Sequence, residues 1–341
     1  MRVPATAYSS LAMQRRMVGD EWRTLKFQQS IQSVVQPGMV LIDIGAGSGI
    51  LSCFAAQAGA ERVYAVEREP GAIAMAKRLI WDNGFTEIIR LVEEDAERVW
   101  LPEKADVIVS EWLGAYGVDE NMLRPVLVAR DRWLKPEGVM IPATATAWLA
   151  PVDHPASREA IFFAARPYDL NLGVLDPFPG EQAVCLANGI DTQSLAGEPQ
   201  MMWETNCSTM AASQASKPYV AHLTFQLSGP VSALAAWFSA EMPGIDPLSN
   251  APGQPRTHWG IMLFPVASAL SCKAGDRLHV EFHCVPGGPY GSNHIWAVRV
   301  DDGPLEVHDT RRSPRAGYEP PWRVYDPNHD LLARIELPND N

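Results

Sequence analysis

The sequence predicts an α/β protein in which a Rossmann-like, doubly wound parallel sheet is followed by an antiparallel, barrel-like β domain. Over residues 37–142, short apolar runs typical of buried strands alternate with segments of helical periodicity. From residue 143 onward the pattern changes to short strands separated by Gly and Pro turns. The length of 341 residues favours the same division, because single hydrophobic cores rarely grow beyond about 250 residues.

A helix is expected over residues 10–36, where apolar residues are interleaved with charges and Pro37-Gly38 supplies a stop. MVLIDIGAG then predicts a strand, GILSCFAAQAGA a helix and RVYAVE a second strand, which together make a βαβ unit. A helix over residues 71–83 and strands at IIRLVEED and ADVIVSEW continue the alternation. Because parallel strands need such crossovers, the sheet is expected to be parallel and to end near Pro142.

The second domain is assigned to residues 143–308. Its expected strands are the alternating segments TATAWLAPV, YVAHLTFQL, ALAAWFSAEM, RLHVEFHCV and HIWAVRV. Clustered apolar residues at about 154–180 would be costly to expose on a monomer, so we expect an arm that packs against a second copy in a homodimer. Residues 309–341 are rich in proline and arginine and are expected to form a C-terminal extension or flap.

The composition excludes several classes of protein. No segment approaches the ~20 uncharged apolar residues that span a bilayer, and the N-terminus lacks the apolar core of a secretory signal, so a cytoplasmic location is expected. A net charge of −12 repels nucleic acid and favours a cationic substrate. The five cysteines form no CxxC pair, which predicts buried thiols, no disulfide framework and no metal site.

A glycine-rich turn follows the first predicted strand. DIGAGSG places Asp43 at the end of that strand and Gly45, Gly47 and Gly49 in the turn, where missing side chains let a ligand approach the backbone. Glu67 ends the second strand, where a carboxylate accepts hydrogen bonds from both hydroxyls of a ribose. The spacing is GxGxG and not the GxGxxG of dinucleotide enzymes. A plain glycine-rich turn and an NAD site remain alternatives.

Two further side chains favour S-adenosylmethionine as the ligand. Glu97 follows the third strand and is placed to accept a hydrogen bond from an adenine amino group; the alternative is a solvated glutamate at a helix start. The cofactor's carboxylate needs a cation, and Arg23 in the leading helix offers a planar fork that binds a carboxylate bidentately.

Glu111 and Glu120 lie on either side of a glycine-bearing loop in SEWLGAYGVDENML. Two carboxylates that face one pocket repel each other unless a cation lies between them, and guanidinium is the biological cation whose fork of donors matches two carboxylates. Two ordinary surface glutamates are the alternative for such a pair seen alone.

SEWLG and ENML resemble the double-glutamate loop of the protein arginine N-methyltransferase family. In the same order as in that family, DEWRT at residues 20–24 resembles its cofactor-clasping helix, VLIDIGAGSGILS its glycine loop, ARDRWLKPEGVMIP its sheet exit and THW at residues 257–259 its substrate-side loop. The resemblance extends from residue 8 to about residue 300. It implies a class I methyltransferase that uses S-adenosyl-L-methionine and methylates a guanidino nitrogen of arginine.

The resemblance assigns the cofactor contacts residue by residue. It implies that Arg23 binds the methionine carboxylate, that Asp43 and residues 45–49 shape the loop, that Glu67 holds the ribose and that Glu97 holds the adenine. Tyr8 matches the tyrosine that begins the family's N-terminal helix signature, which implies that it closes over the cofactor and substrate. Residues 1–36 would then form the helix that clasps the cofactor, with Met17 beside it.

For the reaction, the resemblance implies that Glu111 and Glu120 clamp the guanidinium and that His258 pairs with Asp20. Methyl transfer is an in-line displacement, so the protein has to align the nitrogen with the methyl carbon and stabilise the charge that gathers on the guanidinium. The proton acceptor stays open between a glutamate and the Asp20–His258 pair.

The residues Trp112, Asp119, Met122 and Trp259 are assigned to the substrate pocket. Methionines at the positions of Met17 and Met122 favour monomethylarginine or asymmetric dimethylarginine as the product. Two positions of the double-glutamate loop that are usually aromatic are Ala115 and Asp119 here, and only about seven residues precede Tyr8.

Because Asp119 would suit a free α-ammonium group, we expect a bacterial-type member that acts on free L-arginine or a small arginine derivative. The first alternative is a methyltransferase acting on arginine- and glycine-rich proteins. The second, from another class, is a non-catalytic scaffold that binds S-adenosylmethionine, against which the presence of both glutamates argues. An NAD-dependent oxidoreductase is disfavoured by the GxGxG spacing and by Glu97.

Overall fold

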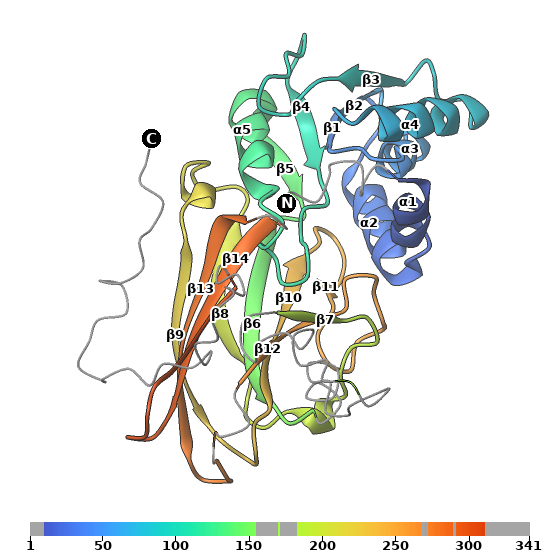
Figure 1. Ribbon diagram of the computed structural model, residues 1–341. Helices are drawn as coiled ribbons and strands as arrows, with labels where there is room; N and C mark the ends of the chain where they lie inside the picture. Colours follow the sequence, from blue (N-terminus) through green and yellow to red (C-terminus); the bar gives the residue numbers. More distant parts are fainter. Residues whose placement is uncertain are drawn as a thin grey trace.

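The computed structural model describes residues 10–154, 170, 183–266, 270, 272–288 and 291–310. Figure 1 shows a parallel sheet with its helices at the top and two antiparallel sheets below it. The predicted fold class, a Rossmann-like parallel sheet followed by an antiparallel β domain, is confirmed. Tyr8, most of the predicted arm and nearly all of the C-terminal extension lie outside the described residues.

The parallel sheet has the strand order β3-β2-β1-β4-β5. Its strands are β1 (Val40–Ile44), β2 (Arg62–Glu67), β3 (Ile89–Glu93), β4 (Ala105–Val109) and β5 (Leu134–Ile141). The connecting helices are α3 (Ile50–Gln57), α4 (Pro70–Asp82) and α5 (Leu123–Trp133). The first four strands and the first two helices lie where the alternation of apolar runs predicts them.

The N-terminal segment forms two helices and not the one that the sequence predicts. α1 (Leu11–Val18) ends at Gly19, and α2 (Glu21–Val34) begins after Asp20, whose side chain accepts a hydrogen bond from the backbone N–H of Arg23. A glycine followed by a capping aspartate ends one helix and begins the next, so the predicted continuity was wrong. Phe27 and Ile31 of α2 are fully buried in the core of the parallel sheet.

The antiparallel domain consists of a six-stranded sheet and a four-stranded sheet. The first sheet has the order β7-β12-β10-β6-β8, with β11 paired to β10, and the second has the order β15-β14-β13-β9. The strands are β6 (Thr144–Val152), β7 (Val184–Leu186), β8 (Gln200–Asn206), β9 (Tyr219–Gln226), β10 (Ala233–Glu241), β11 (Leu248–Ser249), β12 (Ile261–Pro265), β13 (Arg277–Gly288), β14 (Gly291–Val300) and β15 (Glu306–Asp309). Two short 3-10 helices are η4 (Thr192–Ser194) and η5 (Gln214–Ser216).

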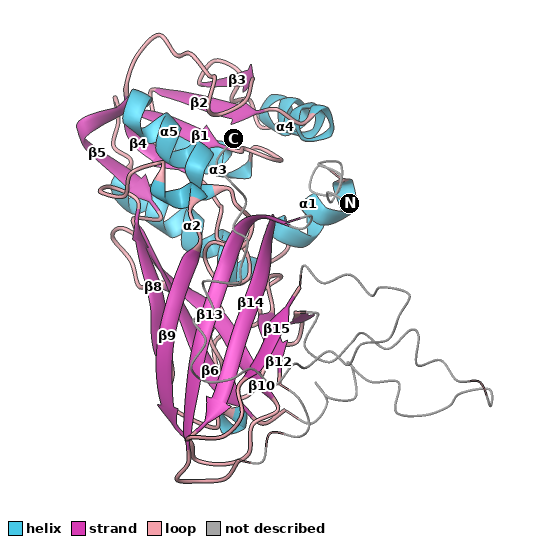
Figure 2. Cartoon of the chain, turned by 60° about the vertical axis from the view of Figure 1, so that its left-hand side comes forward, coloured by secondary structure: helices cyan, strands magenta, loops and turns pink. Residues whose placement is uncertain are grey.

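The two antiparallel sheets bury a shared aromatic core beneath the parallel sheet (Figure 2). Phe264 of the first sheet meets Phe282 of the second edge-on, with 4.7 Å between ring centroids, and Trp296 lies 5.3 Å from Phe264. Tyr116, from the loop after β4, enters the same core. The loop that carries the two predicted glutamates is therefore anchored in the second domain.

Two other expectations, on the cysteines and on membrane-spanning segments, can be compared with the structure. Cys53, Cys207 and Cys284 are buried as expected, but Cys185 is exposed and Cys272 is partly exposed, so that expectation was wrong for these two thiols. Cys185 lies on β7, which among the described strands is at the end of its sheet and pairs with β12 alone. In the part of the chain that the structure describes, every helix is too short or too polar to span a bilayer.

Candidate active site

The predicted site residues gather where the strand order of the parallel sheet changes direction. β1 and β4 are neighbours, with Asp43 opposite Val109, so the loops that follow these strands leave the sheet side by side. The Ser110 hydroxyl donates to the carbonyl of Ile44 at 2.7 Å and joins the two loops directly. In open α/β sheets this crevice at the carboxyl ends of the strands is the usual place for a ligand.

The glycine loop after β1 has the backbone that its sequence requires. Gly45, Gly47 and Gly49 have φ values of 71°, 56° and 80°, which residues other than glycine rarely adopt. The Glu67 carboxylate accepts a hydrogen bond from the Gly47 N–H at 2.8 Å. The Asp43 carboxylate accepts one from the Ser52 hydroxyl at 2.7 Å, and burial raises the pKa of Asp43 to about 6.

Gln14 of α1 covers this loop, a contact that the sequence does not predict. Its Oε1 accepts a hydrogen bond from the Ser48 N–H at 3.0 Å, and a Cβ at Gly47 would lie only 3.1 Å from the same oxygen. The sequence shows only a polar residue within a predicted amphipathic helix. That pattern does not tell whether the glutamine side chain is buried against the glycine loop or exposed to solvent.

Arg23 and Glu111 form a buried ion pair between α2 and the loop after β4. Arg23 Nη2 donates to Glu111 Oε2 at 3.0 Å, with side chains 7% and 12% exposed. The guanidinium also lies 5.6 Å from the ring centroid of Phe27 and 5.9 Å from that of Trp259. Its Nε and Nη1 are buried and have no hydrogen-bond partner in the part of the chain that the structure describes. Unpaired buried donors are costly, so this arrangement suits an additional acceptor.

Asp20 and His258 are brought together as the motif predicts. Asp20 Oδ2 accepts hydrogen bonds from the His258 backbone N–H at 2.7 Å and contacts the ring Nδ1 at 2.8 Å. Burial raises the pKa of Asp20, but hydrogen bonds from His258 and Arg23 outweigh it and hold that pKa below its ordinary value. Arg16 of α1 donates to the His258 carbonyl at 2.9 Å. Both N-terminal helices thus contact the loop that precedes β12.

Asp119 does not have the surroundings that its predicted role requires. Its carboxylate accepts hydrogen bonds from the N–H groups of Ala115 and Tyr116 at 3.2 and 3.1 Å, and the residue is buried. Burial raises its pKa to about 6. The side chain fixes the turn of its own loop, as aspartate commonly does in turns. These contacts give no support to the expectation that it faces a free α-ammonium group.

Glu120 lies at the other end of this loop, beside the start of β14. The Ser292 hydroxyl donates to the side-chain oxygen of the adjacent Asn121 at 3.0 Å, and a Cβ at Gly291 would come within 3.1 Å of the Glu120 Cα. Asn121 has a φ of 59°, which turns the chain sharply into α5. The position of Glu120 is therefore set by the antiparallel domain as well as by its own loop.

The remaining predicted residues lie around this centre. Met122 is close to Gly45, because a Cβ there would lie 3.8 Å from the Met122 Cε. Met17 is partly buried on α1. The Glu97 carboxylate pairs with Arg124 of α5, which fixes it next to the end of β3.

The two predicted tryptophans have different surroundings. Trp259 packs edge-on against Phe238 with 5.0 Å between ring centroids, and it lies beside the ring of His258. Trp112 is only 1% exposed and belongs to the core of the parallel sheet. The side chain packs in this core next to Glu111, and its assignment to the substrate pocket stays a prediction.

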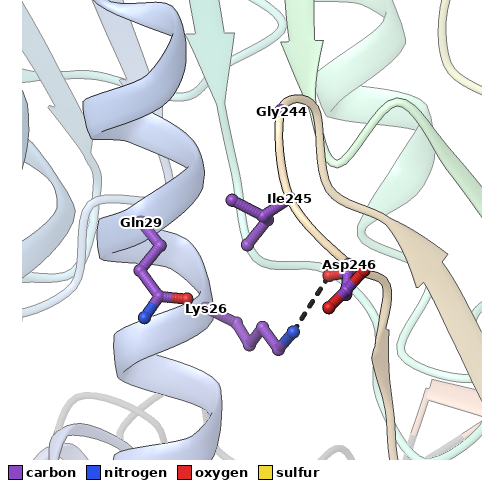
Figure 3. Close-up of a pocket in the computed structure, with 5 residues that line it drawn as sticks. All are labelled: Lys26, Gln29, Gly244, Ile245 and Asp246. Carbon is purple, nitrogen blue, oxygen red and sulfur yellow. Dashed lines mark hydrogen bonds between the residues drawn. The ribbon is translucent and has the colours of Figure 1, made fainter.

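A hollow of about 610 Å³ lies elsewhere, between α2 and the loop that follows β10 (Figure 3). It is lined by Lys26, Gln29, Gly244, Ile245 and Asp246, and Lys26 donates to the Asp246 carbonyl at 3.1 Å. Of the predicted site residues that the structure describes, none lines it. Its contacts attach the middle of α2 to the antiparallel domain.

Comparisons with known proteins agree with this geometry. The family described as ribosomal protein L11 methyltransferase (PrmA) matches residues 23–141, which hold the parallel sheet. Protein arginine N-methyltransferase PRMT10 of Arabidopsis thaliana is 32% identical over 306 residues, which cover 80% of each chain. PRMT10 of Oryza sativa subsp. japonica is 31% identical over 316 residues, which cover 82% of each chain. The crystal structure of Arabidopsis thaliana protein arginine methyltransferase 10 superimposes with a TM-score of 0.73 at 27% identity, covering 89% of this chain and 99% of that one.

The parallel sheet, its glycine loop and these matches define the class as the class I S-adenosylmethionine-dependent methyltransferases. Within that class, the chain belongs to the protein arginine N-methyltransferase family. The predicted enzyme class and cofactor are confirmed at this level.

Proposed function

We propose that this chain transfers a methyl group from S-adenosylmethionine to a guanidino nitrogen of arginine side chains in proteins. The observation that carries the proposal is that Glu111 already binds a guanidinium, that of Arg23, in a pocket closed to most solvent. The Arg23 contact uses Oε2, and Oε1 accepts from the Leu113 N–H at 3.0 Å. Each carboxylate oxygen can accept a further hydrogen bond, so the oriented group can also take a substrate guanidinium.

The residues of the crevice fit the cofactor. Nε and Nη1 of Arg23 have no partner among the described residues, and either charged donor suits a carboxylate oxygen. The positive φ angles of the glycine loop keep its backbone free of side chains where a ligand would lie. Arg23 would hold the methionine carboxylate, Glu67 the ribose and Glu97 the adenine. S-adenosylmethionine supplies an activated methyl group on a sulfonium ion.

The chain's own side chains would then orient the acceptor and balance its charge. Glu111 and Glu120 would draw positive charge toward the guanidinium nitrogens that do not react, which leaves electron density on the one that does. Donors and acceptors fixed before the reaction stabilise the transition state without reorganisation. The Asp20–His258 contact of 2.8 Å supplies a proton acceptor next to this centre; a glutamate is the alternative acceptor.

Protein arginine takes precedence over free arginine as the proposed substrate. The bacterial-type, small-molecule assignment depended on Asp119, and that carboxylate is engaged within its own loop. The two relatives named above are protein arginine N-methyltransferases, and this chain matches about four-fifths of the length of each. No feature of the described site calls for a free α-ammonium or α-carboxylate group.

The test is mass spectrometry of the purified protein incubated with S-adenosylmethionine and, in separate reactions, an arginine- and glycine-rich peptide and free L-arginine. We expect a gain of one CH₂, or two, on arginine in the peptide. A gain on free arginine alone would contradict the proposed substrate class. A gain on neither, from protein that binds S-adenosylhomocysteine, would indicate the non-catalytic scaffold.

A further inference from the structure

Asn250 joins three segments that are far apart in the sequence. Its side-chain Oδ1 accepts a hydrogen bond from the Phe238 N–H of β10 at 2.9 Å. Its Nδ2 donates to the carbonyl of Ala115 at 2.8 Å and to the carbonyl of Gly260 at 2.7 Å. The residue is 5% exposed, so these hydrogen bonds are shielded from solvent. Both amide hydrogens and the amide oxygen have partners.

The two carbonyls belong to the two sides of the candidate active site. Ala115 lies in the middle of the double-glutamate loop, between Glu111 and Glu120. Gly260 follows Trp259 and lies two positions after His258. Asn250 therefore spans the short gap between the loop that carries the carboxylates and the segment that carries the histidine.

The peptide groups of Ala115 are held from opposite directions. Its N–H donates to Asp119 at 3.2 Å within the loop, whereas its carbonyl accepts from Asn250 in the antiparallel domain. A methyl side chain offers little packing of its own, so these polar contacts set the position of the loop's centre. Because these contacts are buried, loss of the donor to the Ala115 carbonyl would cost free energy of folding.

We infer that Asn250 is a positioning residue for methyl transfer, which fixes the double-glutamate loop relative to the His258 segment. This inference rests on the proposed function. An amide is suited to the task because it supplies two donors and one acceptor from one small planar group. Aspartate would keep the acceptor for Phe238 but would place a second oxygen against two carbonyl oxygens.

The test compares Asn250→Asp with the wild type and with Ser249→Ala. Ser249 is a matched control, because its hydroxyl donates to the Phe238 carbonyl and accepts from the Ala251 N–H, and among the described residues it bonds to neither loop. We expect Asn250→Asp to lower kcat on the arginine-rich peptide by about 100-fold, the scale that follows a misplacement of about 1 Å at a reacting centre. Its Kd for S-adenosylhomocysteine should stay within about threefold of the wild-type value, because Asn250 contacts none of the proposed cofactor ligands. Ser249→Ala should keep both constants.

The split between kcat and cofactor affinity separates positioning from a loss of folded protein. Calorimetric titration with S-adenosylhomocysteine gives the folded fraction as the binding stoichiometry, and kcat is corrected for it. If Asn250→Asp does not fold, Asn250→Thr, which keeps one donor and one acceptor, should show the same split with a smaller loss. A corrected kcat near the wild-type value would overturn the inference, as would equal losses of kcat and cofactor affinity. Absence of methyl transfer by the wild type would instead refute the proposed function.

Discussion

Replacement of Arg23 by lysine tests how the site holds its cofactor. Lysine keeps a positive charge beside Glu111, so the ion pair that Arg23 forms in the structure has a substitute. It loses the planar guanidinium, whose buried Nε and Nη1 are the donors from which we propose a hydrogen bond to the methionine carboxylate. A hydrogen bond to a charged group is worth roughly 1.5–3 kcal/mol, and loss of one such bond raises Kd about 10- to 100-fold.

The assay is calorimetric titration of wild type and Arg23→Lys with two ligands. S-adenosylhomocysteine carries the amino-acid carboxylate and should bind the variant about 10- to 100-fold more weakly. 5′-Methylthioadenosine has the same nucleoside without that carboxylate, and its affinity should be equal for both proteins. Arg130→Lys is a matched control for the loss of a buried guanidinium, because Arg130 binds the Met210 carbonyl at 2.8 Å far from the glycine loop. It should lower stability and leave both affinities unchanged.

Two outcomes would refute this reasoning. An S-adenosylhomocysteine affinity within about threefold of wild type would show that the fork of Arg23 does not bind the carboxylate. Equal losses for both ligands would show that the substitution disturbs the whole crevice, in which case the unpaired donors have no specific ligand.

Three other results are expected. Glu120→Gln should lower kcat by at least ~100-fold with little change in the Kd of S-adenosylhomocysteine, because only the charge facing the guanidinium is lost; a near-normal rate would contradict the clamp. Burial raises the pKa of Asp43 from 3.8 to about 6, so the native carboxyl binds its proton more tightly than the unfolded one and stability falls as pH rises between these values. Asp43→Asn removes this pH dependence. In urea unfolding from about pH 4 to pH 7, the free energy of unfolding of the wild type should fall by up to ~3 kcal/mol relative to that of the variant. A difference between the two proteins that stays constant with pH would exclude the raised pKa. Light scattering at micromolar concentration should give a dimer, because the clustered apolar residues at about 154–180 would be costly to expose on a monomer. A strict monomer would count against the predicted arm.

Much of the fold follows from local sequence patterns. The runs that become β1, β2 and β4 are apolar because both faces of a parallel sheet are covered, and such runs are evident without any knowledge of their neighbours. The division of the N-terminal segment at Gly19 was missed because its apolar residues keep a helical spacing on both sides of the break. The strands β7 and β12 were not predicted either, because VCL and IMLFP are short and lack an apolar–polar alternation.

Some contacts of the candidate site were also predicted from the sequence, and others were not. Asp20 and His258 are 238 residues apart, and only the resemblance of their motifs predicts the pairing. Asn250 and Ala115 are 135 residues apart and lie in no motif that the sequence analysis used, so their contact becomes visible only in three dimensions. Asp119 shows a second reason why a site prediction can fail. The sequence shows that an aspartate is present in the loop, but not whether its carboxylate faces a ligand or accepts hydrogen bonds from its own backbone.

The long-range contact of Asp20 also bears on how the protein matures during synthesis. The parallel sheet is complete by residue 141, so it can form while the rest of the chain is still being made. The partner of Asp20 on the other side of the site arrives only with His258, and Trp259, which lies over the guanidinium of Arg23, arrives with it. A shortened product that ends before these residues would keep the nucleotide-binding half but lack one wall of the reaction centre. Methyl transfer is thereby restricted to chains whose second domain has been made and has folded against the first.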